Sequence, residues 1–125
     1  MSDLRGVVVS HAELAAALVT AVRAISGIDD ALHAVSNEGC DPAALAARID
    51  AAIGPGPAVV FVDLPGGSCL TSTVRFARGR PDVAVVTGVN LAMLLDFVFH
   101  RELSPPDAAR RAADAGGRAI RTPAA

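Results

Sequence analysis

Short apolar runs and longer helix-like stretches alternate along the whole chain. The run at residues 6–10 is rich in valine and apolar on both faces, which suits a strand buried between helices. The run at 58–62 gives the strongest strand signal, and shorter or weaker runs lie at 31–36 and 83–86. Four strands that alternate with helices predict a three-layer α/β/α fold with a mostly parallel sheet.

Residues that favour helix ends mark the boundaries of the helices. Apolar residues recur every three or four positions in the first stretch, and Gly27 follows it where a C-cap glycine belongs. Asp41-Pro42 predicts an N-cap with proline in the first turn, and Ser104 begins the last helix in the same way. We expect Gly116-Gly117 to end that helix, which leaves residues 118–121 for a final strand. The predicted helices span residues 12–26, 42–53, 68–78, 90–99 and 105–115.

Composition predicts one domain over residues 1–125. A chain of 125 residues that is 52% hydrophobic is long enough for one core and too short for two ordinary domains. It has no Trp or Tyr and four Phe, so aromatic platforms for stacking bases are not expected. All 11 basic residues are arginines, scattered along a chain of net charge −2. Nucleic acid is therefore not an expected partner.

The sequence shows no segment typical of export or membrane insertion. Its first residues lack a basic region followed by an apolar stretch, and no apolar run approaches the roughly 20 residues of a membrane span. We expect a cytoplasmic protein with no direct membrane insertion. Cys40 and Cys69 have neither the spacing of a zinc site nor that of a C-x-x-C motif, which predicts free thiols.

Candidate chemistry lies just after two of the predicted strands. His11 follows the first strand, and Asp63 follows the third. If these strands are neighbours, their carboxyl ends open a crevice where the two side chains meet. A neutral imidazole can attack phosphorus when one ring nitrogen keeps its lone pair, and a carboxylate on the other nitrogen holds that tautomer. Asp63 would orient the ring and stabilise the positive charge that develops on it.

A glycine-rich turn beside Asp63 supplies the remaining parts of a phosphoryl-transfer site. Gly66, Gly67 and Ser68 lead into a helix, and they offer backbone N–H groups, a hydroxyl and a positive helix end to phosphate oxygens. Ser68 is the side chain that we expect to contact the phosphoryl group. This chemistry requires no metal and no cofactor.

Three segments carry a resemblance to a known family. Residues 7–11 (VVVSH), 62–68 (VDLPGGS) and 86–94 (VTGVNLAML) resemble the mannose-family (mannose/fructose/sorbose) IIA domain of the phosphoenolpyruvate-dependent sugar phosphotransferase system, and the likeness extends over nearly the whole chain. The resemblance implies that His11 takes phosphate from the phosphocarrier protein HPr and passes it to a IIB component for sugar uptake. It implies that Asp63 partners the imidazole and that the loop ending in Ser68 lines the site. It also implies a homodimer in which a C-terminal antiparallel strand, at about residues 119–122, is exchanged between subunits.

The chain departs from the family pattern at three places. Ala12 follows the histidine where glycine is usual, Leu64-Pro65 replaces a pair that often contains an aromatic residue, and Cys69 stands where proline is common. These differences bear on the shape of the loops and on partner contacts more than on the chemistry.

Each candidate residue also has a purely structural interpretation. Asp63 could cap a helix, and Gly66-Gly67 could serve only a turn that needs positive φ. Cys69 is better explained as a small packing residue than as a reactive thiol. We expect His33, within a strand, and His100, near a helix end, to be non-catalytic.

Other functions are compatible with parts of the sequence. The same histidine could report phosphorylation state to a regulatory partner, or the chain could be the phosphoryl-donor subunit of dihydroxyacetone kinase. A receiver domain is disfavoured because Ser10-His11 replaces the acidic cluster that binds magnesium after the first strand. A purely structural interaction domain would be indicated if His11 and Asp63 lay far apart. The sequence does not name a sugar, since the membrane components of such systems select it.

Overall fold

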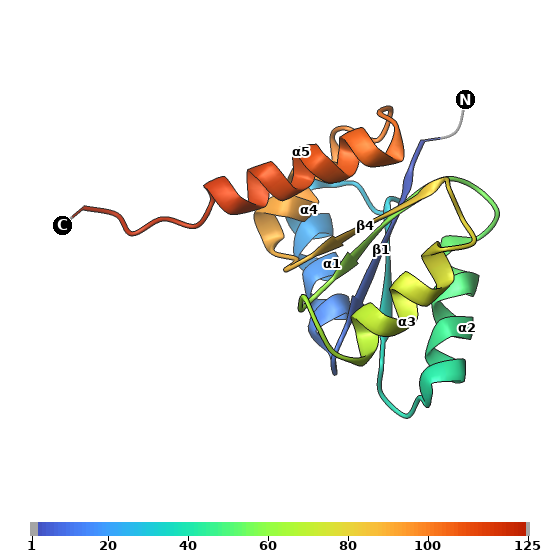
Figure 1. Ribbon diagram of the computed structural model, residues 1–125. Helices are drawn as coiled ribbons and strands as arrows, with labels where there is room; N and C mark the ends of the chain where they lie inside the picture. Colours follow the sequence, from blue (N-terminus) through green and yellow to red (C-terminus); the bar gives the residue numbers. More distant parts are fainter. Residues whose placement is uncertain (1–2, 125) are drawn as a thin grey trace.

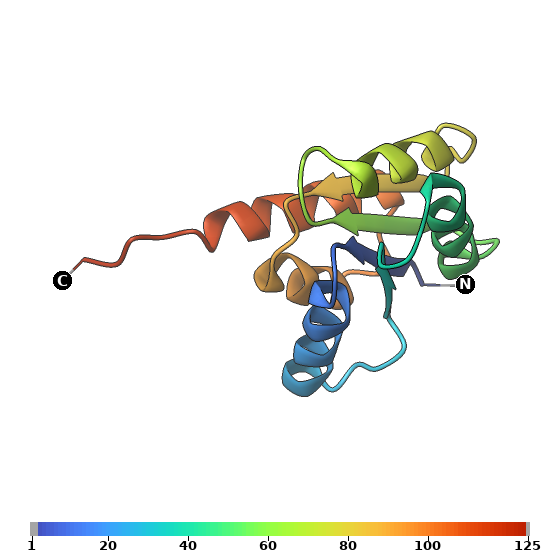
Figure 2. The same cartoon turned by 90° about the horizontal axis from the view of Figure 1, so that it is seen from below.

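A parallel sheet lies between two layers of helices in the computed structural model, which describes residues 3–124 (Figure 1 and Figure 2). The strands are β1 (Arg5–Ser10), β2 (Leu32–Ser36), β3 (Ala58–Val62) and β4 (Val83–Thr87). The helices are α1 (Leu14–Ser26), α2 (Pro42–Ile53), α3 (Ser68–Ala77), α4 (Leu91–Val98) and α5 (Pro105–Arg118). The strand order is β2-β1-β3-β4, and every pair is parallel. The predicted α/β class and its four strands are confirmed.

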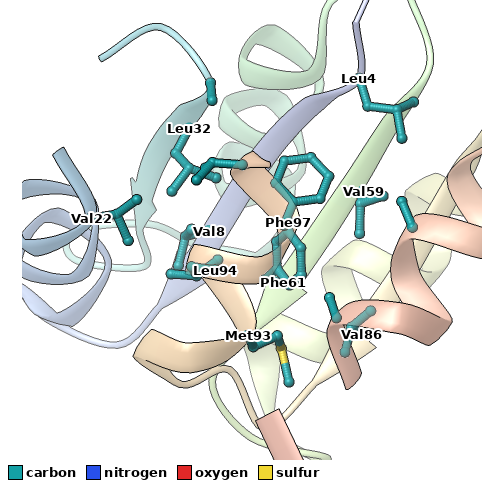
Figure 3. Packing of buried hydrophobic residues seen from close by; sticks show 14 of the residues in the cluster. Leu4, Val8, Val22, Leu32, Val59, Phe61, Val86, Met93, Leu94 and Phe97 are labelled. Atoms are coloured by element: carbon teal, nitrogen blue, oxygen red, sulfur yellow. The ribbon is translucent and has the colours of Figure 1, made fainter. Parts of the chain in front are cut away.

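Two hydrophobic cores explain why the central strands are apolar on both faces. On one face α1, α4 and α5 cover side chains such as Val8 and Phe61, and the Phe61 ring meets that of Phe97 edge to face at 5.1 Å (Figure 3). On the other face α2 and α3 cover side chains such as Val7 and Val60. All five residues of β3 are buried. Each central strand therefore packs against helices through both of its faces.

The predicted helix ends are mostly confirmed. Gly27 ends α1 in the left-handed conformation, with φ of 74°. The Asp41 carboxylate caps α2 by accepting a hydrogen bond from the Ala44 N–H at 2.8 Å. Asn90 caps α4 in the same way. These local signals are reliable because each satisfies a backbone group that the helix leaves unpaired.

The last helix ends later than expected. We predicted that Gly116-Gly117 would end it, but α5 continues to Arg118. The reason is packing: a Cβ on Gly116 would lie 3.0 Å from the Met93 side chain and 3.1 Å from Asn90 Oδ1. Glycine thus lets α5 approach α4 closely. Residues 120–124 form no strand within the chain, and in Figure 1 they leave the body of the domain, so the exchanged strand stays a prediction.

Candidate functional site

His11 and Asp63 meet where β1 and β3 end. Val9 pairs with Val62 at the last step of the β1–β3 ladder; Asp63 follows Val62 directly, and His11 follows Ser10, the last residue of β1. The Asp63 Oδ2 atom lies 2.7 Å from His11 Nδ1 and accepts a hydrogen bond from the His11 backbone N–H at 3.0 Å. Asp63 Oδ1 accepts another from the Leu64 N–H at 3.0 Å. The carboxylate is thus fixed by backbone amides, and it in turn orients the ring.

The pair combines a buried carboxylate with an exposed imidazole. The side chain of Asp63 is 8% exposed and that of His11 is 45% exposed. Burial raises the pKa of Asp63, but the hydrogen bonds from the His11 backbone and ring outweigh it and hold that pKa below its usual value. An ionised carboxylate at Nδ1 favours the tautomer with its proton there. The Nε2 lone pair then remains free, and Nε2 makes no hydrogen bond with any residue from 3 to 124.

Two hydrogen bonds hold the loop that carries His11. The buried Ser10 hydroxyl accepts a hydrogen bond from the Ala15 N–H at 2.7 Å, at the start of α1. The Asn37 side chain, which follows β2, accepts one from the Ala12 N–H at 3.3 Å. Sequence reasoning missed both roles, although Ser10 and Asn37 follow strand runs that end at the same edge of the sheet. Ala12 itself has φ of 51°, in the left-handed region that favours glycine.

The glycine-rich turn leads into α3 as predicted. Gly67 has φ of 93° and ψ of −174°, a conformation that essentially only glycine adopts. No side chain among residues 3–124 caps α3, so the first N–H groups of this helix keep their hydrogen-bonding capacity for an anion. Gly66 and Ser68 are exposed. In the part of the chain that the structure describes, the Ser68 hydroxyl makes no hydrogen bond with His11.

Cys69 is the other side chain that reaches the histidine ring. It is fully buried, and its Sγ lies 3.9 Å from His11 Nδ1. Burial and the nearby charge of Asp63 raise the pKa of this thiol. A thiol with a raised pKa is a poor nucleophile, which agrees with the expectation of a packing residue. His11, Asp63 and Cys69 are also the residues here that could hold a metal ion.

The other two histidines lie elsewhere. His33 is within β2, and its pKa is lowered by burial and by the positive charges of Arg5 and Arg23. The Nδ1 atom of His100 lies 2.7 Å from the backbone carbonyl oxygen of Asp96, one helical turn earlier. That Nδ1 atom is also 3.6 Å from the Asp96 carboxylate. Neither histidine follows a strand beside a glycine-rich turn.

The fold and the site thus define an α/β protein with a histidine–aspartate pair at the carboxyl ends of two central parallel strands. A family model described as "PTS system fructose IIA component" matches residues 6–113. The chain therefore belongs to the mannose-type IIA family of the sugar phosphotransferase system. IIA proteins are phosphotransferase components of that system.

Solved structures of similar fold agree with this assignment. A phosphotransferase system component EIIA from Streptococcus agalactiae has a TM-score of 0.87 at 18% identity, with 95% of this chain and 96% of that chain covered. A mannose/sorbose specific IIA subunit from Enterococcus faecalis has a TM-score of 0.82 at 25% identity, with 99% and 97% covered. A comparison with curated protein sequences gave no match. Among residues 3–124 no helix is both long enough and apolar enough to span a membrane.

Proposed function

We propose that this domain is a phosphoryl carrier in which Nε2 of His11 accepts a phosphoryl group from phospho-HPr and passes it to a IIB component for sugar uptake. The observation that carries the proposal is the 2.7 Å contact between His11 Nδ1 and Asp63 Oδ2 on a ring that is 45% exposed. This contact points the nucleophilic nitrogen outwards, where a partner protein can present its phosphoryl group. A site that serves protein partners needs no deep pocket.

The transfer consists of one bond made and one bond broken. The Nε2 lone pair attacks phosphorus, and the bond between phosphorus and the donor breaks as the N–P bond forms. The imidazole then carries a positive charge with its proton still on Nδ1, and the Asp63 carboxylate stabilises it at hydrogen-bond distance. Transfer to the acceptor reverses these steps. Asp63 therefore orients the ring and balances its charge, and it does not take the phosphoryl group.

The start of α3 would hold the phosphoryl oxygens. The turn at Gly66-Gly67 leaves the first amides of α3 uncapped, and the helix end carries a partial positive charge. In this proposal the exposed Ser68 hydroxyl turns towards the phosphoryl group once it is present. These donors act on charge that develops during transfer, so they need no contact with the resting histidine.

The direct test is phosphorylation with radiolabelled phosphoenolpyruvate, enzyme I and HPr. We expect acid-labile phosphate on the wild-type protein and none on His11→Ala. Matched controls are His33→Ala and His100→Ala, which remove the other two histidines and should keep the label. A labelled His11→Ala protein would overturn the proposal. Chase with a IIB domain should then remove the label from the wild type.

A cytoplasmic homodimer is part of this proposal. β4 is one of the two edge strands of the sheet, and a groove along it is lined by β4 and by Pro106, Ala109 and Ala113 of α5. Ile120 is 78% exposed on the segment that follows α5. This segment would pair with β4 of a second copy and cover the open edge. Light scattering should give a dimer for the full chain and a monomer for a chain ending at Arg118; a monomeric full chain would exclude the exchange.

A further inference from the structure

Three side chains with different metal-binding atoms converge beside the exposed histidine ring. His11 Nδ1, an Asp63 carboxylate oxygen and Cys69 Sγ lie within 4.8 Å of one another. No other group of three potential ligands is found among residues 3–124. One nitrogen, one oxygen and one sulfur ligand make a set that Zn²⁺ and similar divalent transition-metal ions accept.

We propose that His11, Asp63 and Cys69 bind a divalent transition-metal ion such as Zn²⁺, with the fourth coordination position open to solvent. In a tetrahedral zinc site, nitrogen and sulfur ligands are roughly 3.6 Å apart and nitrogen and oxygen ligands roughly 3.3 Å apart. The observed separations are 3.9 Å from His11 Nδ1 to Cys69 Sγ and 2.7 Å from His11 Nδ1 to Asp63 Oδ2. The nitrogen–oxygen separation would have to widen and the nitrogen–sulfur separation to shorten slightly, and the exposed His11 ring is the ligand that can adjust.

The surroundings keep the other two ligands in place during that movement. Asp63 stays fixed by the backbone N–H groups of His11 and Leu64, both at 3.0 Å, when the ring hydrogen bond is lost. Cys69 is held in the first turn of α3 and is fully buried. Metal binding releases the thiol proton to solvent, and the resulting thiolate and the carboxylate neutralise the two positive charges of the ion.

The bound ion would switch off phosphoryl transfer, a consequence that rests on the proposed function. A metal ion on Nδ1 requires the imidazole proton to move to Nε2. The nitrogen that attacks phosphorus then has no free lone pair, and the Asp63 carboxylate is no longer available to stabilise the phosphorylated ring. The metal site and the phosphoryl-acceptor site thus share one imidazole, and each state excludes the other.

Cobalt provides a readout of the site that is independent of activity. Co²⁺ added to the full chain should produce a sulfur-to-metal charge-transfer band that saturates at one ion per chain. Cys69→Ser and Cys69→Ala should abolish the band, and Cys40→Ser should keep it, since Cys40 is the other free thiol. Circular dichroism establishes that each variant is folded. A band that persists in both Cys69 variants, or a folded wild type without one, would overturn the metal site.

Zinc inhibition then tests the consequence. With each protein compared with its own rate in a chelator, Zn²⁺ should slow phosphorylation of the wild type at least 10-fold more than that of Cys69→Ala. Equal inhibition of both proteins would contradict the switch. If the cobalt band forms on a wild-type protein that cannot be phosphorylated at all, the phosphoryl-carrier proposal fails while the metal site stands. If phosphorylation proceeds and no band forms, the metal site fails while the phosphoryl-carrier proposal stands.

Discussion

Two histidines of this chain have an aspartate beside Nδ1, and the two pairs are built differently. In the His11–Asp63 pair the partners are 52 residues apart and meet only because β1 and β3 are neighbours. In the His100–Asp96 pair the partners are four residues apart, with Asp96 in the last turn of α4 and His100 just after its end. In the first pair the ring nitrogen Nδ1 of His11 lies 2.7 Å from the Asp63 carboxylate oxygen Oδ2. In the second pair the ring nitrogen lies 2.7 Å from the Asp96 backbone carbonyl oxygen instead.

The surroundings of Asp96 explain why the proposed phosphoryl-acceptor site is at His11 and not at His100. Asp96 faces α5 rather than a glycine-rich turn, and its Oδ1 lies 3.3 Å from Arg111 Nε. The other oxygen, Oδ2, is buried and has no hydrogen bond within the described residues. This aspartate links two helices. An aspartate beside a histidine therefore does not by itself mark a candidate site; His11 differs from His100 in that its partner Asp63 leads into the glycine-rich turn before α3.

The largest expected effect is a difference in phosphorylation rate between variants of the two aspartates. Asp63→Asn should lower the rate of phosphorylation by HPr roughly 10²- to 10⁴-fold, because the amide can hold the ring in the wrong tautomer and cannot balance its positive charge. Asp96→Asn is the matched control and should keep the wild-type rate. Rapid-quench measurement of label incorporation checks both. Equal rates for the two variants would remove the distinction between the pairs.

A second prediction concerns the structural role of Asp96. Arg111→Ala should lower the free energy of unfolding by about 1 to 2 kcal/mol, because it leaves a largely buried carboxylate without its arginine. Arg110→Ala removes the neighbouring arginine, which pairs with the exposed Asp107, and should change stability by less than about 0.5 kcal/mol. Urea unfolding measures both values. Similar losses for the two variants would contradict an ion pair that stabilises the α4–α5 contact.

The pH dependence of stability provides a third test. The pKa of Asp63 is lower in the folded protein than its ordinary value, so its ionised form contributes stability above about pH 4. That contribution is lost as the pH falls through the folded-state pKa. Asp63→Asn lacks it, and its stability should therefore decline less steeply than the wild type's below about pH 4. Parallel declines in urea unfolding between neutral and acidic pH would show that the histidine hydrogen bonds do not stabilise the carboxylate.

The smallest expected effect is on stability, and it comes from backbone strain at Ala12, next to His11. Ala12 is the only residue other than glycine with positive φ between residues 3 and 124. Ala12→Gly should relieve strain and raise the unfolding free energy by about 0.5 kcal/mol, after the entropy cost of glycine is subtracted. Ala16→Gly, in the exposed face of α1, should lower it by about 0.5 to 1 kcal/mol. A destabilising Ala12→Gly would indicate that the left-handed conformation is not strained.

Much of this arrangement could be predicted from local signals. The buried strands follow from valine-rich runs, and helix ends follow from residues such as Gly27 and Asp41, which act on their own backbone neighbourhood. His11 and Asp63 could be paired because parallel strands end at one edge of the sheet. The contact of Cys69 with the ring and the hydrogen bond from Ala12 to Asn37 depend on side-chain positions set by tertiary packing. The end of α5 was misplaced because a glycine favoured at helix ends is also favoured wherever two helices touch.

Asn90 connects the start of one helix to the end of another. Its Oδ1 accepts a hydrogen bond from the Met93 N–H at 2.9 Å, and its Nδ2 donates one to the Gly116 carbonyl oxygen at 3.0 Å. The last turn of α5 is therefore clamped to the first turn of α4. Because residues 119–124 leave the domain directly after this turn, the Asn90 amide helps to fix the point from which the C-terminal segment departs.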